Sequence, residues 1–205
     1  MIIQTKTIRH LLLPALLLLP ACALAARQGP PDTSPGGWYA ALDAINITTG
    51  FPGVSAGYTS PRGWNAEVSA AATWLLLKES GACAEHVTLQ TGLTKFFPVQ
   101  SQPGMAWGPG FGVAAGYYDF EEGFLGSQGQ YVGLTAGLSL QQQVGERTCV
   151  KLSAWVLAAT AQDNPYGTSK LDGRLLWKSR QNGFFVAPAA MRISIVYYFK
   201  QKKEK

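Results

Sequence analysis

Residues 184–199 constrain the fold of this chain more than any other segment. The odd positions from 185 to 199 are all apolar or aromatic, whereas the even positions from 190 to 198 include Arg192 and Ser194. Because successive side chains of a β-strand point to opposite faces, this strand has one apolar face and one polar face. An apolar face that ends in aromatic residues is typical of a strand that closes a membrane β-barrel.

Seven further runs alternate in the same way, and turn-forming residues separate them. They lie at residues 39–48, 54–59, 64–76, 86–97, 110–120, 131–143 and 148–160. With residues 184–199 they make eight strands, an even number, as single-chain bacterial outer-membrane barrels have. The sequence therefore predicts an all-β fold, an eight-stranded antiparallel transmembrane β-barrel.

The face opposite the apolar one carries serine, threonine, glycine, glutamine and aromatic residues, with few lysines or glutamates. A barrel of eight strands has room inside only for side chains, so this composition indicates a filled interior. Inward glycines are expected to make room for large rings. They are Gly92, Gly112, Gly116, Gly133 and Gly137, and the rings are Tyr118, Tyr131 and Trp155. A soluble, lipocalin-like periplasmic binder would also alternate, and it is the less favoured reading.

The first 25 residues have the features of an export signal. Lys6 and Arg9 form a basic start, residues 11–19 are apolar, and Ala-Leu-Ala at 23–25 is a small-residue cleavage site. Cys22 follows Leu-Pro-Ala, which loosely resembles a bacterial lipoprotein box, so lipidation of Cys22 is an alternative that we favour less. No later segment approaches the ~20 continuous apolar residues that a spanning helix requires.

The sequence after residue 25 divides into three predicted segments. Residues 26–37 are rich in proline and glycine and predict a flexible leader, residues 38–200 form the barrel, and residues 201–205 form a basic tail. Without Lys6 and Arg9, 15 of the 17 basic residues remain against 12 acidic ones. Outside the tail the mature chain is nearly neutral and has no basic stripe, which argues against a nucleic-acid partner. No cofactor or metal site is predicted.

Three charged side chains are placed inside the barrel by the alternation: Glu67, Lys151 and Arg192, with Asp43 a candidate fourth. Buried charges are costly unless they are paired. We therefore expect a salt-bridge network that locks the barrel rather than an ion path.

His86 is the only histidine that remains after export. Barrel enzymes that modify lipid A use a histidine with a serine or aspartate, and the lipid A deacylases place the serine two residues after the histidine. This chain has Thr88 at that position, and Glu85 points to the opposite face of the strand. The favoured function is therefore non-enzymatic, with a lipid A deacylase-like enzyme using His86 as the alternative.

Two polar stretches, 120–129 and 161–182, are predicted to be external loops that contact other molecules. The second one contains charged and aromatic residues suited to protein or glycan contact. These candidates are Tyr166, Asp172, Arg174 and Trp177. The connection 98–109 is longer than a periplasmic turn is expected to be.

Residues 53–200 resemble a Bacteroidota family of small outer-membrane β-barrels of unknown function, often encoded near fimbrial genes. The resemblance is carried by Leu93-Thr-Lys-Phe-Phe97, Gly112-Val-Ala-Ala-Gly-Tyr-Tyr-Asp119, Gly133-Leu-Thr-Ala-Gly-Leu-Ser-Leu140 and Arg192-Ile-Ser-Ile-Val-Tyr-Tyr-Phe-Lys200. The chain has Val186-Ala-Pro-Ala-Ala190 where that family has a Gly-Pro-Thr-Lys stretch. The resemblance implies an eight-stranded barrel and a role in assembling or anchoring fimbriae. It implies no catalytic residues. The export signal and the strand pattern predict a Gram-negative outer membrane as the location, with the lipid bilayer and surface or periplasmic proteins as partners.

Overall fold

A computed structural model describes residues 36–46, 53–77, 82–168 and 175–199 of the chain. The strands are β1 Gly37–Asn46, β2 Gly53–Thr59, β3 Trp64–Leu77, β4 Ala82–Lys95, β5 Phe97–Pro98, β6 Met105–Glu122, β7 Leu125–Gln143, β8 Thr148–Thr168, β9 Leu175–Trp177 and β10 Gln181–Tyr198. Among these residues, none forms a helix with the length and apolar character needed to cross a bilayer.

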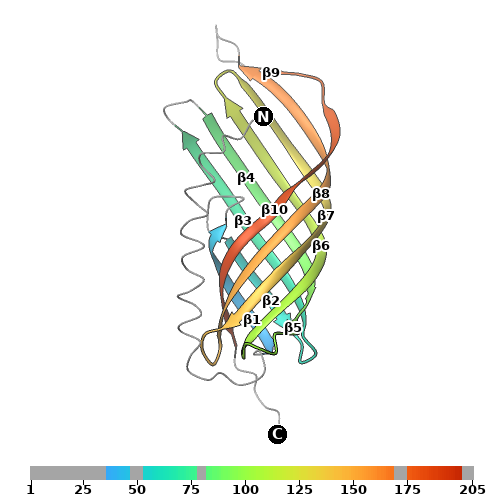
Figure 1. The fold of residues 1–205 in the computed structure, drawn as a ribbon. Helices are drawn as coiled ribbons and strands as arrows, with labels where there is room; N and C mark the ends of the chain where they lie inside the picture. Colours follow the sequence, from blue (N-terminus) through green and yellow to red (C-terminus); the bar gives the residue numbers. More distant parts are fainter. Residues whose placement is uncertain (1–35, 47–52, 78–81, 169–174, 200–205) are drawn as a thin grey trace.

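Eight of the strands close into a ring, which confirms the predicted eight-stranded antiparallel barrel (Figure 1). Their order is β1-β2-β3-β4-β6-β7-β8-β10, every neighbouring pair is antiparallel, and pairing of β10 with β1 completes the ring. The two short strands lie outside the ring: β5 pairs with β6 and β9 pairs with β8.

The two ends of the barrel differ. At one end, which we call the base, are the connections 60–63, 99–104 and 144–147. The first and last residues of the barrel also meet there, since the Phe199 N–H donates to the Trp38 carbonyl at 2.9 Å. At the other end, which we call the tip, a two-residue turn at 123–124 joins β6 to β7. Gly123 takes a positive φ of 65°, which glycine adopts readily and which this tight turn requires.

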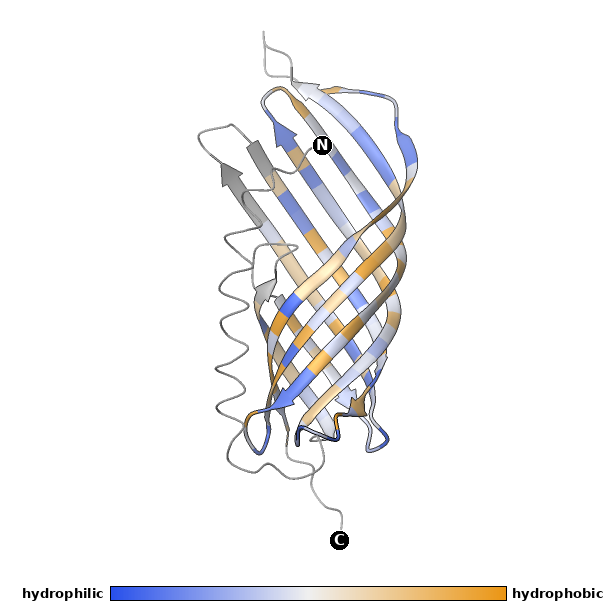
Figure 2. Ribbon diagram, in the orientation of Figure 1, coloured by the Kyte–Doolittle hydropathy of each residue, from blue (hydrophilic) through white to orange (hydrophobic). Residues whose placement is uncertain are grey.

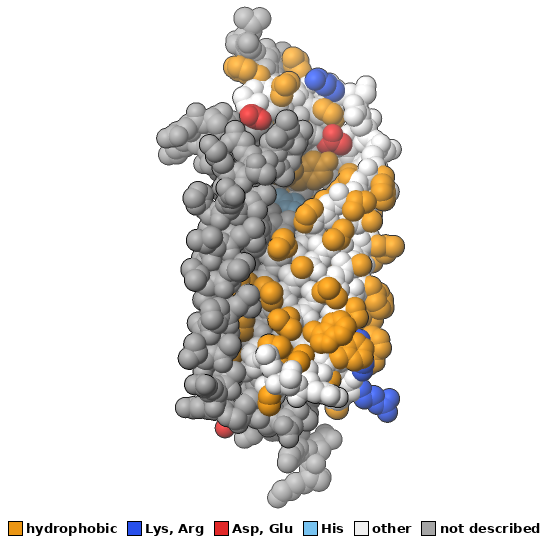
Figure 3. All heavy atoms as spheres, viewed as in Figure 1, with side chains coloured by type: hydrophobic (Ala, Val, Ile, Leu, Met, Phe, Trp, Pro, Cys, Tyr) orange, Lys and Arg blue, Asp and Glu red, His pale blue; other side chains and the backbone are white. Residues whose placement is uncertain are grey.

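Hydrophobic and polar residues alternate along the strands (Figure 2), and this alternation separates the two faces of the wall. On β7, Leu134 and Leu138 are 69% and 58% exposed, whereas the intervening Thr135 and the following Ser139 are buried. The outer face is therefore apolar and the inner face polar. Large aromatic side chains stand on the outer face near the base: Trp38, Trp64, Trp107 and Tyr197. A space-filling view shows the apolar side chains spread over the outside of the wall (Figure 3).

Several predicted boundaries were wrong. β6 begins at Met105, and Phe97–Pro98 pairs with Trp107 and Ala106, so the connection 98–109 is largely a hairpin with its turn at 99–104. Of the stretches predicted as external loops at 120–129 and 161–182, residues 120–122, 125–129 and 161–168 are strand, since β6, β7 and β8 extend into them, and residues 169–174 lie outside the described part of the chain. Strand pairing is carried by backbone hydrogen bonds, so it continues where the side chains are polar on both faces.

The prediction that every odd residue from 185 to 199 faces outward was also wrong. A register shift between Pro188 and Ala190 interrupts the pairing of β10 with β8. A bulge of this kind reverses the face to which the following residues point. Between the bulge and the base, the odd residues point outward as predicted. Between the bulge and the tip, the even residues point outward instead: Phe184 is 70% exposed, whereas Phe185 is half-buried against Tyr131.

Candidate functional site

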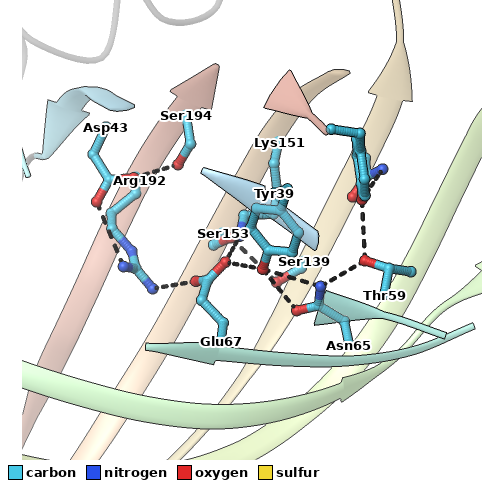
Figure 4. Close-up of polar contacts among 12 residues, drawn as sticks. Tyr39, Asp43, Thr59, Asn65, Glu67, Ser139, Lys151, Ser153, Arg192 and Ser194 are labelled. Atoms are coloured by element: carbon cyan, nitrogen blue, oxygen red, sulfur yellow. Dashed lines mark hydrogen bonds and ion pairs between the residues drawn. The ribbon is translucent and has the colours of Figure 1, made fainter. Parts of the chain in front are cut away.

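A charged cluster fills the interior near the base, and we call its members Asp43, Glu67, Lys151 and Arg192 the charged plug. The Glu67 carboxylate pairs with the Lys151 ammonium and lies 3.5 Å from Nη2 of Arg192. Nη1 of Arg192 lies 3.5 Å from Oδ2 of Asp43. The structure thus brings Glu67, Lys151 and Arg192 together, with Asp43 as the fourth member, and two anions balance two cations (Figure 4).

Each member of the charged plug comes from a different strand, and neighbouring hydroxyl and amide groups hold the two carboxylates. The Ser194 hydroxyl donates to Asp43 at 2.6 Å, and the Tyr39 hydroxyl donates to Glu67 at 2.7 Å. The Asn65 amide in turn donates to the Tyr39 oxygen at 3.0 Å. Hydrogen bonds of this kind are what make a buried charge tolerable. The plug therefore ties β1, β3, β8 and β10 into one unit.

The space left inside the plug is very small. Its void has a volume of about 10 Å³ between Glu67, Gln90, Trp155 and Arg192. That is room for about one water molecule. At this level the interior of the barrel is filled, as predicted.

Glycines on the inner face make room for large rings, as predicted, at Gly92, Gly116 and Gly137; at Gly112 and Gly133 an added Cβ atom would instead meet backbone atoms or Ala159, so that part of the prediction was wrong. A Cβ atom added at Gly137 would lie 2.7 Å from the Trp155 ring, and one at Gly116 would lie 2.5 Å from the Tyr131 ring. Gly110 has the same relation to Trp155, at 2.5 Å, and it was not among the glycines predicted for this role. Each ring covers a glycine that the register places opposite it on the neighbouring strand: Gly116 is opposite Tyr131, and Gly137 is opposite Trp155. The position of the rings therefore depends on the strand register.

A second interior cluster lies nearer the tip. The Nε2 atom of His86 lies 2.9 Å from the hydroxyl oxygen of Tyr131, and Thr88 lies on the same face of β4, opposite Gly116. The rings of Tyr131 and Phe185 meet edge to face with their centroids 6.0 Å apart. We call His86, Thr88, Tyr131 and Phe185 the histidine cluster. All four side chains are half-buried, whereas Ala159 beside them is 1% exposed.

The contacts of His86 differ from the histidine–serine pattern of the lipid A deacylases. The described partner of the His86 ring is a tyrosine hydroxyl rather than a serine paired with a carboxylate, and a hydroxyl nucleophile needs both a base and a group that orients it. In the described part of the chain, no three His, Cys, Asp or Glu side chains are grouped so as to hold a metal ion. What the cluster offers is one hydrogen-bonding pair beside aromatic and small apolar side chains.

The predicted loop contacts are placed differently from the expectation. Tyr166 lies in β8 and is 5% exposed, and its hydroxyl donates to Oδ1 of Asp119 at 2.8 Å. Its expected role as an exposed loop residue is therefore wrong. Trp177 in β9 is 53% exposed and contacts the Tyr166 ring. Asp172 and Arg174 lie outside the described residues.

Exposed apolar side chains stand at the tip, in the turn 123–124 and on the ends of β6, β7 and β9. We call them the apolar tip: Phe120, Phe124, Leu125, Leu176 and Trp177, with exposed fractions between 45% and 62%. The register places Phe120, Leu125 and Leu176 on one face of the wall and Trp177, opposite Tyr166, on the other. Of these five residues only Trp177 was predicted as a contact residue, because both stretches were predicted to be polar loops. The signal that could have revealed it is the pair Phe124-Leu125 directly after Gly123.

A polar band crosses the outer face between the apolar tip and the apolar wall below it. Its members are Gln128, Gln130, Gln162 and Asn182; the Gln130 amide donates to Gln162 at 3.0 Å, and Tyr117 donates to Gln128 at 3.3 Å. An open depression of about 850 Å³ marks the boundary, where Val87 and Val132 meet Gln130 and Gln162. The outside of the barrel therefore changes from apolar to polar well below the tip.

Neither a protein-family model nor a curated protein matches this chain. Among solved structures, the chain is similar to the NMR solution structure of the E. coli outer membrane protein W. The TM-score is 0.38 and the sequence identity 15%, and the alignment covers 81% of this chain and 99% of that chain. This likeness is too distant to assign a family or a function.

Proposed function

We propose that this protein is a non-enzymatic outer-membrane β-barrel that presents a docking surface for a protein of the bacterial surface, as an accessory to an appendage such as a fimbria. Its location is supported by the outer face. Between the aromatic residues near the base and the polar band, outward side chains such as Leu134, Leu138 and Val186 are more than half exposed. An exposed apolar surface of this extent is suited to lipid rather than to water.

The height of the apolar wall fits a bilayer. On β7 the outward residues from Val132 to Leu140 are valine, leucine and alanine. Eight steps of about 3.3 Å along a strand tilted by about 40° rise roughly 20 Å, close to the ~25 Å apolar band of outer-membrane barrels. The charged plug fills the interior at the level of the base, so a structural role is favoured over conduction.

The single observation that carries the docking role is the apolar tip. It stands beyond the polar band, where the surroundings of an outer-membrane barrel are aqueous rather than lipid. Phe124, Leu125 and Trp177 are each more than half exposed there. Exposed apolar patches outside a membrane mark surfaces that bind other proteins. The strands below the tip are paired along their whole length, so the patch sits on a rigid support.

A charge placed on the apolar wall tests the membrane location. We expect Leu134→Arg to lower the free energy of unfolding from lipid vesicles by about 2–4 kcal/mol, because an arginine at the midplane of the bilayer loses its hydration. The measurement is a urea titration followed by tryptophan fluorescence. Gln130→Arg, on the same face but in the polar band, is the matched control with a small expected effect. Equal stability of the two variants would show that lipid does not cover Leu134.

The docking role is tested at the tip. We expect the double variant Phe124→Ser and Trp177→Ser to reduce the number of surface appendages per cell several-fold, while the amount of barrel in the outer membrane stays unchanged. Electron microscopy counts the appendages, and Glu122→Gln at the same end of β6 is the control. An unchanged number of appendages in the double variant would exclude the tip from appendage assembly.

A further inference from the structure

A row of outward side chains crosses neighbouring strands at the tip-side limit of the apolar wall. Cross-strand pairing places one residue from each of β4, β6, β7, β8 and β10 in this row, which we call the boundary row. Its members are Val87, Tyr117, Gln130, Gln162 and Asn182. The next outward row toward the base is mostly apolar: Leu89, Ala115, Val132, Thr160 and Phe184. The register therefore sets polar side chains directly beside apolar ones along one line.

The open depression of about 850 Å³ lies where these two rows meet. Gln130 and Gln162 line it on the tip side, and Leu89 and Val132 line it on the base side. Ala115, between Leu89 and Val132, has a small side chain and leaves space between them. The volume is in the range of sites that bind small molecules. Its polar half and its apolar half suit an amphipathic molecule whose head points toward the tip.

The polar half of the depression is a set of amides joined by an arginine. The Oε1 atom of Gln162 accepts a hydrogen bond from Nε2 of Gln130 at 3.0 Å and another from the Arg180 guanidinium. Both bonds use the oxygen of Gln162, so its NH2 group takes part in neither. Side-chain amides donate and accept at once, as sugar hydroxyls require, and a guanidinium pairs with phosphate. This half therefore offers groups that match a phosphorylated sugar.

The charges beside the depression differ in sign between its two ends. Arg180 directly precedes β10 and is exposed. Glu85 of β4 and Asp119 of β6 stand opposite each other, one outward row nearer the tip than the boundary row. The strands β7 and β8 separate this acidic pair from the Arg180 end. An anionic group is therefore favoured at the Arg180 end, and the neutral amides between the two ends suit an uncharged group.

From this arrangement we infer a binding site for a phosphorylated glycolipid of the outer leaflet. Its acyl chains lie against Leu89 and Val132, its sugar lies over Tyr117 and Gln130, and a phosphate pairs with Arg180. The occupant is a lipid rather than a protein because the apolar half of the depression belongs to the wall that faces the bilayer. The tip is the outward end, since the short turns and both ends of the barrel lie at the base. This inference rests on the membrane location proposed above.

The test uses the full mature barrel in phosphatidylcholine vesicles that contain lipid A as the probe. Native mass spectrometry after transfer to detergent counts the lipid A molecules that stay bound, and we expect saturable retention of one. Ala115→Trp, which fills the depression, abolishes this retention. Ala136→Trp, at an outward alanine of the wall nearer the base, leaves it unchanged. Equal retention by the two variants, or none by the unchanged barrel, would overturn the inference.

Two further variants keep the test valid if Ala115→Trp does not fold. Arg180→Gln and Gln162→Leu should each raise the concentration of lipid A for half-maximal retention about fivefold to tenfold, the effect of losing one hydrogen bond. Arg147→Gln and Gln142→Leu change the same chemical groups near the base and should leave that concentration unaltered. If Arg180→Gln and Gln162→Leu behaved like these two controls, the polar half of the depression would have no part in binding and the inference would be wrong.

Two control lipids identify the chemistry of the ligand. Phosphatidylglycerol carries a phosphate without a sugar, and galactosyl diacylglycerol carries a sugar without a phosphate. We expect the barrel to retain each of them at least about fivefold more weakly than lipid A. Retention of either one as strong as that of lipid A would overturn the assignment to a phosphorylated glycolipid. Leu134→Arg in the same vesicles reports separately on membrane location, so failure of the site and failure of that location are distinguishable.

Discussion

Replacing Glu67 by glutamine is expected to lower the free energy of unfolding by about 3–5 kcal/mol, the cost of leaving a buried charge without its partner. Glu67 is the carboxylate that meets both cations of the charged plug. Its loss leaves Arg192 with Asp43 but deprives Lys151, whose side chain is 4% exposed, of its counter-charge. Urea unfolding in vesicles, followed by tryptophan fluorescence, measures the change.

Two further variants separate this effect from a general sensitivity to substitution. Glu122→Gln at the exposed end of β6 changes the same chemical group and should alter stability by no more than about 0.5 kcal/mol. The double variant Glu67→Gln and Lys151→Gln restores neutrality, so it should be more stable than Glu67→Gln alone by at least about 1 kcal/mol. A Glu67→Gln barrel as stable as the unchanged protein would show that the plug does not lock the strands.

Gly112→Ala is expected to cost about 3 kcal/mol or more, at the upper end of the range for overpacking. A Cβ atom at Gly112 would lie 2.0 Å from the carbonyl oxygen of Thr91 and 2.8 Å from the Cα atom of Gly92. Both atoms belong to the backbone of β4, so no side chain can turn away to relieve the contact. The two strands would have to separate, and the thirteen residue pairs between β4 and β6 would be strained.

The matched control for Gly112→Ala is Gly183→Ala in β10, where an added Cβ atom has no other atom within 4 Å. There the substitution should raise stability slightly, by about 0.4–1 kcal/mol, because alanine restricts the unfolded chain. The comparison is made by the same urea titration. If both variants unfolded at the same urea concentration, the close approach of β4 and β6 at Gly112 would be disproved.

The alternation of side chains predicted the inside and outside of most strands correctly, because its period depends only on strand geometry. It placed Glu67, Lys151 and Arg192 on the inner face, and the structure brings them together. It failed above Pro188, where one extra residue reverses the face of the strand. A bulge of this kind leaves no clear signal in hydropathy, because the inward and outward residues around it, Phe184 to Ala190, are all apolar.

The lengths of the strands were not predictable from their polarity. Residues 161–167 are mostly polar or small and include Pro165, a composition that favours a loop, yet they pair with β7 along their whole length. Pairing there depends on β7 already being in place, which is a property of the assembled sheet. For the same reason the sequence shows only the pair Phe124-Leu125 of the apolar tip, because its other members come from the ends of separate strands.

The sequence by itself determined the closed antiparallel barrel, its apolar outside and its charged inside, because a repeat of two residues decides which face each side chain takes. Only the tertiary structure decided which residues meet across the interior. Tyr131 of β7 reaches His86 of β4 across Gly116 of β6 because the register brings these three residues side by side on neighbouring strands. Such contacts depend on register and strand length, which are fixed by the pairing of the whole sheet rather than by any single segment.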